Sequence, residues 1–204
     1  MELVLATTNP DKQEELVSLL RDLGYTIRTM DEFDSVPRVI EDGETCQANA
    51  MKKATALARH TGMLALADDT GLEVEALGGR PGVYAARYAG EEATYEDNWR
   101  KLLRELKGVP ADKRVARFRT AVAIAEPSSQ VEVVEGVLDG RITESPSGTE
   151  GFGYDPVFLV PELGKTLAQL TLEQKNRISH RARALAKAKE VLKTKLTKVE
   201  SGGA

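Results

Sequence analysis

The sequence lacks most of the features that define disulfide-rich, membrane-spanning or nucleic-acid-coating proteins. Cys46 is the single cysteine among 204 residues, so no disulfide can form within the chain, and a cytoplasmic location is expected. No apolar run approaches the roughly 18 residues that a membrane span requires, so no membrane association is expected. The net charge of −4 gives no basic surplus, which argues against a general nucleic-acid binder.

The composition that remains is typical of a globular protein. Hydrophobic residues make up 41% and charged residues 29% of the chain, which is long enough to bury a core as one domain. The first residues, MELVLATTNPDKQEEL, have no basic segment at their start and become charged early, so they are not expected to form a signal peptide.

Alternating strand and helix patterns predict an α/β fold in the first seventy residues. The predicted elements there are strands over 2–7, 25–29 and 64–67, and helices from Asn9 to Gly24 and over 46–59. A helix over 94–106 and a long antiparallel hairpin, with strands 114–126 and 131–142, are expected to follow. A last helix is predicted over 172–196. We therefore expect a single domain over 1–196, with a second lobe over roughly 110–145 and a flexible tail over 197–204.

Two adjacent carboxylates, Asp68 and Asp69, follow the apolar run 64–67, and Thr70-Gly71 is expected to end that strand. The carboxyl ends of strands are where open α/β sheets bind ligands. Because neighbouring side chains of a strand point to opposite faces, the two aspartates are predicted to have different roles. The alternative is that Asp-Asp-Thr-Gly is only a turn.

Two polar clusters precede predicted helices. The segment Thr7–Lys12 combines free backbone N–H groups, a positive helix end and a lysine, so it fits a phosphate site. The segment Glu41–Thr45 supplies hard oxygen donors on a glycine-containing loop, as Mg²⁺ prefers. Taken alone, the first cluster is more often an ordinary capped helix start and the second a solvated acidic loop.

Two more clusters lie near the end of the chain. Gly148–Pro156 places Phe152 and Tyr154 among three glycines, which lets the backbone lie close to a flat ligand that a ring can stack on. The segment Lys175–Arg181 gathers cations and His180 on a predicted helix, where a solvated helical face is the alternative. Together, metal-binding carboxylates, cations and a glycine-aromatic pocket fit a nucleoside polyphosphate.

Five segments carry a resemblance that covers residues 2–187: ATTNPDKQEEL, EDGETCQANAMKKA, ADDTGLEVEALGGRPGVYAARYAG, GFGYDPVF and KNRISHRARAL. In this order they resemble the HAM1/RdgB family of inosine/xanthosine triphosphate pyrophosphatases. The resemblance implies an elongated, two-lobed α/β fold with a mixed sheet, flanking helices and an active-site cleft between the lobes. It also implies a homodimer that uses Mg²⁺ to hydrolyse non-standard purine nucleoside triphosphates (ITP, dITP, XTP) to the monophosphate and pyrophosphate, a nucleotide-pool house-cleaning role.

The resemblance also assigns roles to individual residues. Asp69 would be the catalytic proton acceptor, and Glu41 and Asp69 would bind the metal. The implied substrate-binding residues are Thr7, Thr8, Asn9, Pro10, Asp11, Lys12, Thr70, Phe152, Gly153, Tyr154, Asp155, Lys175, His180 and Arg181. Among them, Phe152 would stack on the purine base.

The chain departs from the family pattern at four positions. Thr8 replaces a common glycine, Cys46 a common phenylalanine and Ala48 a common glutamate, and the last change leaves the number of metal ions open. Thr70 replaces the usual serine but keeps a hydroxyl. Two other functions remain as alternatives: a related Maf-like enzyme, disfavoured because its arrangement of residues is missing, and a non-catalytic nucleotide-binding module, which would not require Asp69 together with Glu41.

Overall fold

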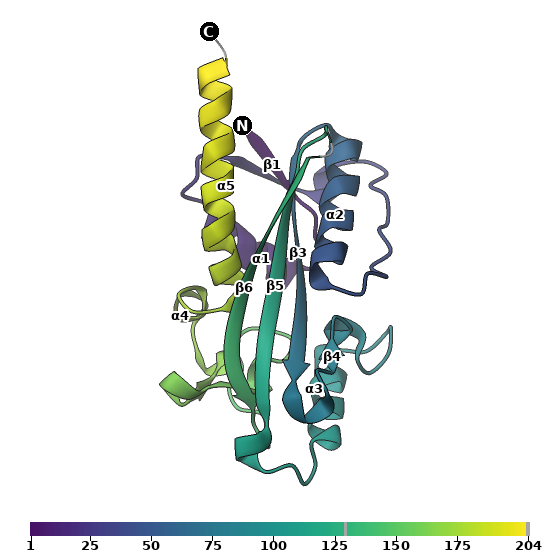
Figure 1. The fold of residues 1–204 in the computed structure, drawn as a ribbon, viewed down its shortest axis with the longest axis vertical. Coiled ribbons are helices and arrows are strands. Elements are labelled where there is room, and N and C mark those ends of the chain that lie inside the picture. The colour runs from purple at the N-terminus through teal and green to yellow at the C-terminus, as the bar shows by residue number, and fades with distance from the viewer. Residues whose placement is uncertain (129, 203–204) are drawn as a thin grey trace. The chain divides into compact units, whose positions relative to one another are not determined.

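The structure is a computed structural model that describes residues 1–128 and 130–202 (Figure 1). Its helices are α1 (Pro10–Leu20), α2 (Cys46–Thr61), α3 (Tyr95–Glu105), α4 (Leu172–Asn176) and α5 (His180–Gly202). Its strands are β1 (Glu2–Leu5), β2 (Thr26–Thr29), β3 (Leu64–Val74), β4 (Pro81–Gly82), β5 (Val115–Ala125), β6 (Val131–Ile142), β7 (Phe158–Val160) and β8 (Lys165–Thr166). The α/β fold class is confirmed.

The strands form one mixed sheet in the order β2-β1-β3-β5-β6-β7-β8, with β4 paired to β3. β1 runs parallel to β2 and β3, whereas β7 runs antiparallel to β6 and β8. The chain divides into two compact units: unit 1 comprises 1–69, 120–136 and the residues from Arg181 onward, and unit 2 comprises 70–119 and 137–180. β3, β5 and β6 therefore contribute residues to both units.

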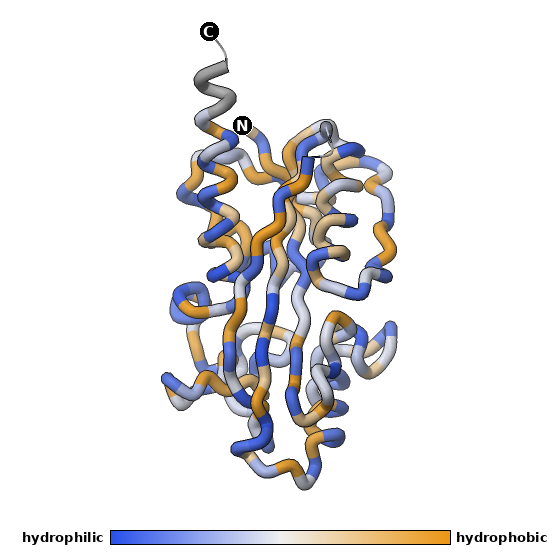
Figure 2. Tube along the Cα trace, in the orientation of Figure 1, coloured by the Kyte–Doolittle hydropathy of each residue, from blue (hydrophilic) through white to orange (hydrophobic). Residues whose placement is uncertain are grey.

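The core of unit 1 follows the two-residue period of its strands. Large side chains on one face pack against α1 and α5, and they include Leu3, Leu5, Leu64, Leu66, Val122 and Ile124. The intervening residues are small and buried, and they include Ala65, Ala67, Ala121 and Ala123. Figure 1 shows α2 on the side of the strands opposite to α5, so the small residues lie on the face that α2 covers. Hydrophobic residues recur along these strands in Figure 2.

The helix ends of unit 1 follow local chemistry. Asn9 caps α1, because its side-chain oxygen accepts from the N–H groups of Asp11 and Lys12. Thr45 caps α2 in the same manner, and Gly62, with a φ of 68°, ends it in the left-handed conformation that favours glycine. Residues next to the helix ends therefore fix where α1 begins and where α2 begins and ends.

The core of unit 2 is formed by α3, the remaining parts of the long strands, and the segment around β7. Leu72, Leu102, Phe118 and Phe158 are among its buried residues, and the rings of Phe118 and Phe158 lie 4.5 Å apart. Tyr154 joins this core, and its hydroxyl donates to the carbonyl of Ala85 at 2.8 Å. The predicted helix over 94–106 is confirmed, with Thr94 as its cap.

Several predictions about element boundaries are wrong. β1 ends at Leu5 and not at residue 7, α1 ends at Leu20 and not at Gly24, and α5 continues to Gly202, beyond the predicted end of the last helix at 196. β3 does not end at Thr70-Gly71 but continues to Val74, because the alternating run of Leu72 and Val74 pairs onward with β4 at Gly82. The last helix is not continuous from 172: α4 ends at Asn176, and both Ile178 and Ser179 donate their backbone N–H to the carbonyl of Lys175. Asn176 and Ser179 are residues that compete with helical hydrogen bonding, which favours a break here.

The domain limits taken from the sequence stay predictions, as does the cleft between lobes. Residue 129 of the predicted hairpin turn, and residues 203 and 204 of the predicted tail, lie outside the described residues. Among the helices of the described part, none is long and apolar enough to cross a membrane.

Candidate functional site

The two aspartates of β3 face different helices, as the strand period predicts. Asp68 has the parity of Leu64 and Leu66, and it forms ion pairs with residues of α1 and α5. Asp69 has the parity of Ala65 and Ala67, and it contacts α2. Because Asp68 and Asp69 lie within a continuous strand and not at its end, the turn interpretation is excluded.

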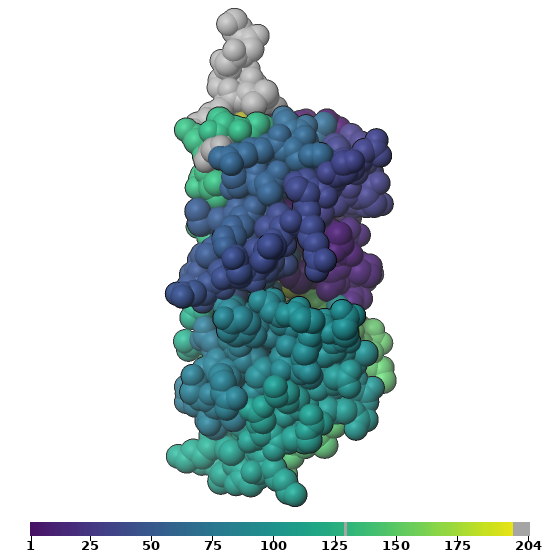
Figure 3. Space-filling view, turned by 90° about the vertical axis from the view of Figure 1, so that its right-hand side faces the viewer, coloured from purple at the N-terminus to yellow at the C-terminus, as the bar shows by residue number. Residues whose placement is uncertain are grey.

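Asp69 belongs to a cluster that contains two carboxylates and one ammonium group. The Nζ atom of Lys53 lies 2.8 Å from Oε2 of Glu41 and 3.3 Å from Oδ1 of Asp69. Glu41 lies on the connection between β2 and α2, which Figure 3 shows in indigo on the surface of unit 1. A cation therefore already lies between the two carboxylates that the sequence predicted as metal ligands.

Burial raises the pKa of Asp69 in spite of the nearby Lys53 and Lys12, and the Glu41 carboxylate acts in the same direction. Burial also acts on Glu41, but Lys53 lowers the pKa of that carboxyl. A carboxylate with a raised pKa is a better proton acceptor near neutral pH than an ordinary one. Asp69 therefore has the electrostatics of a base, and Glu41 those of a permanently charged ligand.

The pair of carboxylates fits Mg²⁺. Within residues 1–128 and 130–202 no group of three or more His, Cys, Asp or Glu side chains could hold a metal. Mg²⁺ does not need such a cluster, because it is usually bound by one or two carboxylates together with substrate phosphates and water. The neighbouring thiol does not compete as a nucleophile, since burial, together with Asp69, raises the pKa of Cys46 to about 12.

Asp68 is itself fully buried and is the centre of a second network of charged side chains. Its Oδ2 accepts from Nε and Nη2 of Arg181 at 3.1 and 2.9 Å, and its Oδ1 lies 3.2 Å from Nζ of Lys12. Arg181 also pairs with Glu15 of α1. Although burial would raise the pKa of Asp68, Lys12 and Arg181 hold it well below its ordinary value. Asp68 is therefore a charged anchor for two cations.

Lys12 is the cation of the predicted phosphate segment. Its side chain is 18% exposed, and burial lowers its pKa although Asp68 acts in the opposite direction. In the preceding turn Thr7 accepts from the N–H of Asn9, and its carbonyl accepts from Gln13. Thr8 and Pro10 are exposed, and Asp11 is half-buried. The structure thus brings the predicted segment Thr7–Lys12 together with Asp68 in unit 1.

The residues predicted to bind the base lie in unit 2. Lys175 and Asp155 form an ion pair in which both side chains are 3% exposed. The Nζ atom of Lys175 also lies 4.6 Å from the ring centroid of Phe152, whose backbone N–H donates to Asp155 at 2.9 Å. The turn needs glycine at Gly151, because a Cβ there would lie 2.1 Å from a carboxylate oxygen of Asp155. Phe152, Asp155 and Lys175 therefore form one group of side chains in mutual contact.

The remaining residues predicted to bind substrate near the end of the chain and in β3 differ in their surroundings. His180 is buried and stacks on Phe118 with ring centroids 4.4 Å apart. Arg181 is 1% exposed and belongs to unit 1, so it does not lie on a solvated helical face. Gly153 has a φ of 62°, a conformation that glycine adopts without strain. Thr70 follows Asp69 within β3 and is half-buried.

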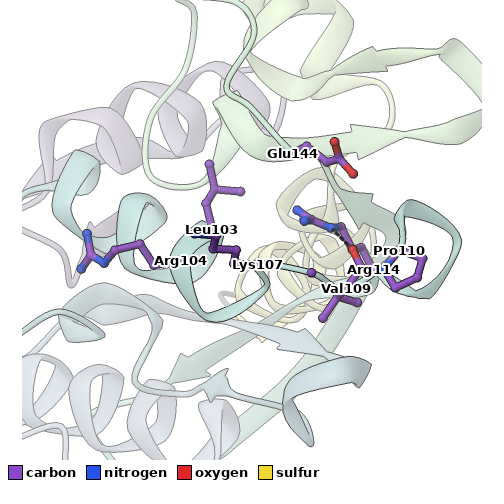
Figure 4. A pocket seen from close by; sticks show the side chains of 8 residues that line it. Leu103, Arg104, Lys107, Val109, Pro110, Arg114 and Glu144 are labelled. Atoms are coloured by element: carbon purple, nitrogen blue, oxygen red, sulfur yellow. Dashed lines mark hydrogen bonds between the residues drawn. The ribbon is translucent and has the colours of Figure 1, made fainter.

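A surface hollow of about 530 Å³ lies at the C-terminal end of α3 and contains none of the predicted site residues (Figure 4). It is lined by Leu103, Arg104, Lys107, Gly108, Val109, Pro110, Arg114 and Glu144. The guanidinium of Arg114 donates to the carbonyls of Leu106, Val109 and Thr143. Arg114 thereby closes the end of α3 and its following turn, so its role here is structural.

Sequence reasoning missed three functional neighbours. It did not predict that Glu15, which is 2% exposed, pairs with Arg181. It gave no role to Asn49, whose amide donates to Asp69. It also missed Tyr95, whose ring lies 5.8 Å from that of Phe152. Of these three residues, only Glu15 gave a sign of its burial in the sequence, because it directly precedes Leu16 on the buried side of α1.

Two curated proteins are similar to this chain over most of its length. The chain is 53% identical over 192 residues to a dITP/XTP pyrophosphatase of Desulforamulus reducens, covering 94% of this chain and 96% of that protein. It is 45% identical over 191 residues to a dITP/XTP pyrophosphatase of Bacillus subtilis, covering 94% and 96%.

Two solved structures of Ham1 proteins are similar to this chain in fold and in sequence. The Staphylococcus aureus Ham1 protein superposes with a TM-score of 0.85 at 38% identity, covering 96% of this chain and all of that chain (100%). A HAM1 protein from Coxiella burnetii gives a TM-score of 0.86 at 42% identity, with coverage of 94% and 98%. The sequence model of the Ham1 family matches residues 3–191, and the chain therefore belongs to the Ham1 family.

Proposed function

We infer that this chain is a nucleoside triphosphate pyrophosphatase that hydrolyses non-standard purine nucleotides such as dITP, ITP and XTP. The observation that carries the proposal is the meeting of Glu41 and Asp69, from distant parts of the chain, at the ammonium group of Lys53. This geometry suits a reaction in which positioning and charge neutralisation matter more than covalent chemistry. The dITP/XTP pyrophosphatases to which the chain is similar support the substrate class.

In this proposal water cleaves the α–β phosphoanhydride, and the products are the nucleoside monophosphate and pyrophosphate. Asp69 accepts the proton of the attacking water, for which its raised pKa is suited. Lys12 and the positive end of α1 attract phosphate oxygens, whereas the N–H groups of Asp11 and Lys12 already donate to the side chain of Asn9. Thr70 places a hydroxyl next to the reacting groups.

Glu41 and Asp69 would hold Mg²⁺. When bound, the metal neutralises phosphate charge and lowers the pKa of water. The ammonium group of Lys53 pairs with both carboxylates. Metal binding would therefore weaken or displace these ion pairs of Lys53.

Base recognition falls in this proposal to Phe152, which stacks on the purine, and to the Lys175–Asp155 pair beside it. The ammonium of Lys175 only donates hydrogen bonds, so it favours a 6-oxo group, which accepts them, over the 6-amino group of adenine, which donates. A site built to hydrogen-bond one of two related bases discriminates between them by several powers of ten, more than pocket shape does. The homodimer and the cytoplasmic location stay predictions.

The test is a panel of ITP, dITP, XTP, GTP and ATP with Mg²⁺, in which pyrophosphate and orthophosphate are measured separately. We expect pyrophosphate as the product, a preference for the first three substrates, and loss of activity in EDTA. Asp69→Asn should lower release about 10²–10⁴-fold. Asp139→Asn, at an exposed carboxylate paired with Arg117, should not change it. Stepwise orthophosphate release, or full activity in EDTA, would contradict the proposal.

A further inference from the structure

The buried amide of Asn49 joins the two parts of the chain that carry the candidate metal ligands. Asn49 is 1% exposed and lies in the first turn of α2. Its Oδ1 accepts from the backbone N–H of Gly43 at 2.8 Å, and its Nδ2 donates to Oδ2 of Asp69 at 3.3 Å. Gly43 follows Glu41 by two residues, so a single side chain connects the Glu41 loop with Asp69.

The chemistry of the partners fixes the orientation of this amide. A backbone N–H only donates, so the Asn49 oxygen must face Gly43 and its NH₂ group must face Asp69. The two oxygens of Asp69 are then distinct: Oδ2 is held by Asn49, while Oδ1 faces Nζ of Lys53. Oδ1 is therefore the oxygen presented to a cation.

The loop is shaped to accept the amide. A Cβ added at Gly43 would lie 2.6 Å from Oδ1 of Asn49 and 2.9 Å from Cβ of Ala48. The backbone of Gly43 is not in the left-handed region, so packing against Asn49, and not conformational strain, is what requires glycine at this position.

We propose that Asn49 is a positioning residue of the metal site, which sets the spacing of Glu41 and Asp69 and directs Oδ1 of Asp69 toward the cation. This inference rests on the proposed function, because it takes these carboxylates as metal ligands. Hydrogen-bond partners behind metal ligands orient them, and their substitution typically weakens metal affinity about 10–100-fold.

The chain provides a matched control in Asn98, which is 2% exposed. Its Oδ1 accepts from the N–H of Ala89 at 2.7 Å, and its Nδ2 donates to the carbonyl of Ala86 at 3.0 Å. Asn49→Leu and Asn98→Leu therefore each remove one buried amide and one partner of a backbone N–H. Only the first also removes a donor to a carboxylate.

The experiment measures Mn²⁺ binding to the nucleotide-free protein by electron paramagnetic resonance, together with thermal melts of each variant. Mn²⁺ serves as the probe because it shares the preference of Mg²⁺ for carboxylate oxygen. We expect both variants to melt earlier, the Mn²⁺ dissociation constant to rise about 10–100-fold in Asn49→Leu, and no change in Asn98→Leu. KM for ITP at saturating Mg²⁺ should remain unchanged in the control variant Asn98→Leu.

A folded Asn49→Leu variant with the unsubstituted protein's Mn²⁺ affinity would overturn the inference, as would an equal loss in Asn98→Leu. If Asn49→Leu does not fold, the variant Gly43→Ala tests the inference instead. The added Cβ at residue 43 displaces the side-chain amide of Asn49 without replacing Asn49 itself. Weaker Mn²⁺ binding by Gly43→Ala supports the inference, and unchanged binding contradicts it. Failure of the unsubstituted protein to bind Mn²⁺ would contradict the metal site of the proposed function, and the inference with it.

Discussion

Asp68 and Asp69 are neighbours in one strand, yet the same substitution should have opposite effects at the two positions. Asp68→Asn removes the charge that faces Lys12 and Arg181, whereas Asp69→Asn removes the charge beside Glu41. Asparagine keeps the shape of aspartate in both cases. We expect Asp68→Asn to unfold readily, and Asp69→Asn to fold well but lose catalysis.

The stability loss at Asp68 follows from complete burial. The side chain of Asp68 has 0% exposure and that of Arg181 has 2%, so the substitution leaves a buried cation with only Glu15 as its charged partner. Removing one partner of a buried ion pair costs about 3–5 kcal/mol. In a domain of this size each kcal/mol lowers the melting temperature by about 2–4 °C, so we expect a decrease of about 6–20 °C.

Asp69→Asn should not lower the stability of the protein, because the pKa of Asp69 is raised in the folded state. A carboxyl whose pKa is higher in the folded protein than in the unfolded chain is destabilising when ionised at neutral pH. A neutral amide removes that cost, so the melting temperature should stay equal or increase. Loss of the proton acceptor should lower kcat about 10²–10⁴-fold, which corresponds to about 3–5 kcal/mol in the activation barrier.

The assay combines thermal melts in EDTA with pyrophosphate release at saturating Mg²⁺ for both variants. The reasoning would be refuted if Asp68→Asn had the same melting temperature as the unsubstituted protein. A folded Asp69→Asn variant that kept near-normal kcat would refute it equally.

Three further predictions concern Asp68, Glu15 and Tyr95. Because the pKa of Asp68 is lowered on folding, its stabilisation is present above its unfolded pKa of about 4 and is lost as the pH falls below that value. The gap in melting temperature between the unsubstituted protein and Asp68→Asn should thus narrow from pH 7 toward pH 3, and a constant gap would contradict this. Glu15→Gln should lower the urea midpoint, since Arg181 loses a buried charged partner; an unchanged midpoint would argue against that pairing. Tyr95→Ala should raise KM for ITP about 2- to 10-fold, because an aromatic pair with Phe152 contributes about 0.5–1.5 kcal/mol, and unchanged KM would exclude a role for Tyr95.

The sequence by itself determined the features that depend on near neighbours. The cap at Asn9, the glycine end of α2 at Gly62 and the opposite faces of Asp68 and Asp69 all follow from local hydrogen bonding or from the two-residue period of a strand. The same locality explains the agreement of β6 with its predicted range, 131–142.

Only the tertiary structure decided which distant residues meet, and with them the meaning of the charged residues. The sequence left Arg181 between a substrate-binding role and a solvated helical face. In the structure it is buried between Asp68 and Glu15, which lie 113 and 166 positions away in the chain. Asn49 gave no signal of its role, because its amide contacts depend on how α2 lies against β3. Burial and long-range pairing reverse the usual preference of charged groups for water, and no local pattern encodes either of them.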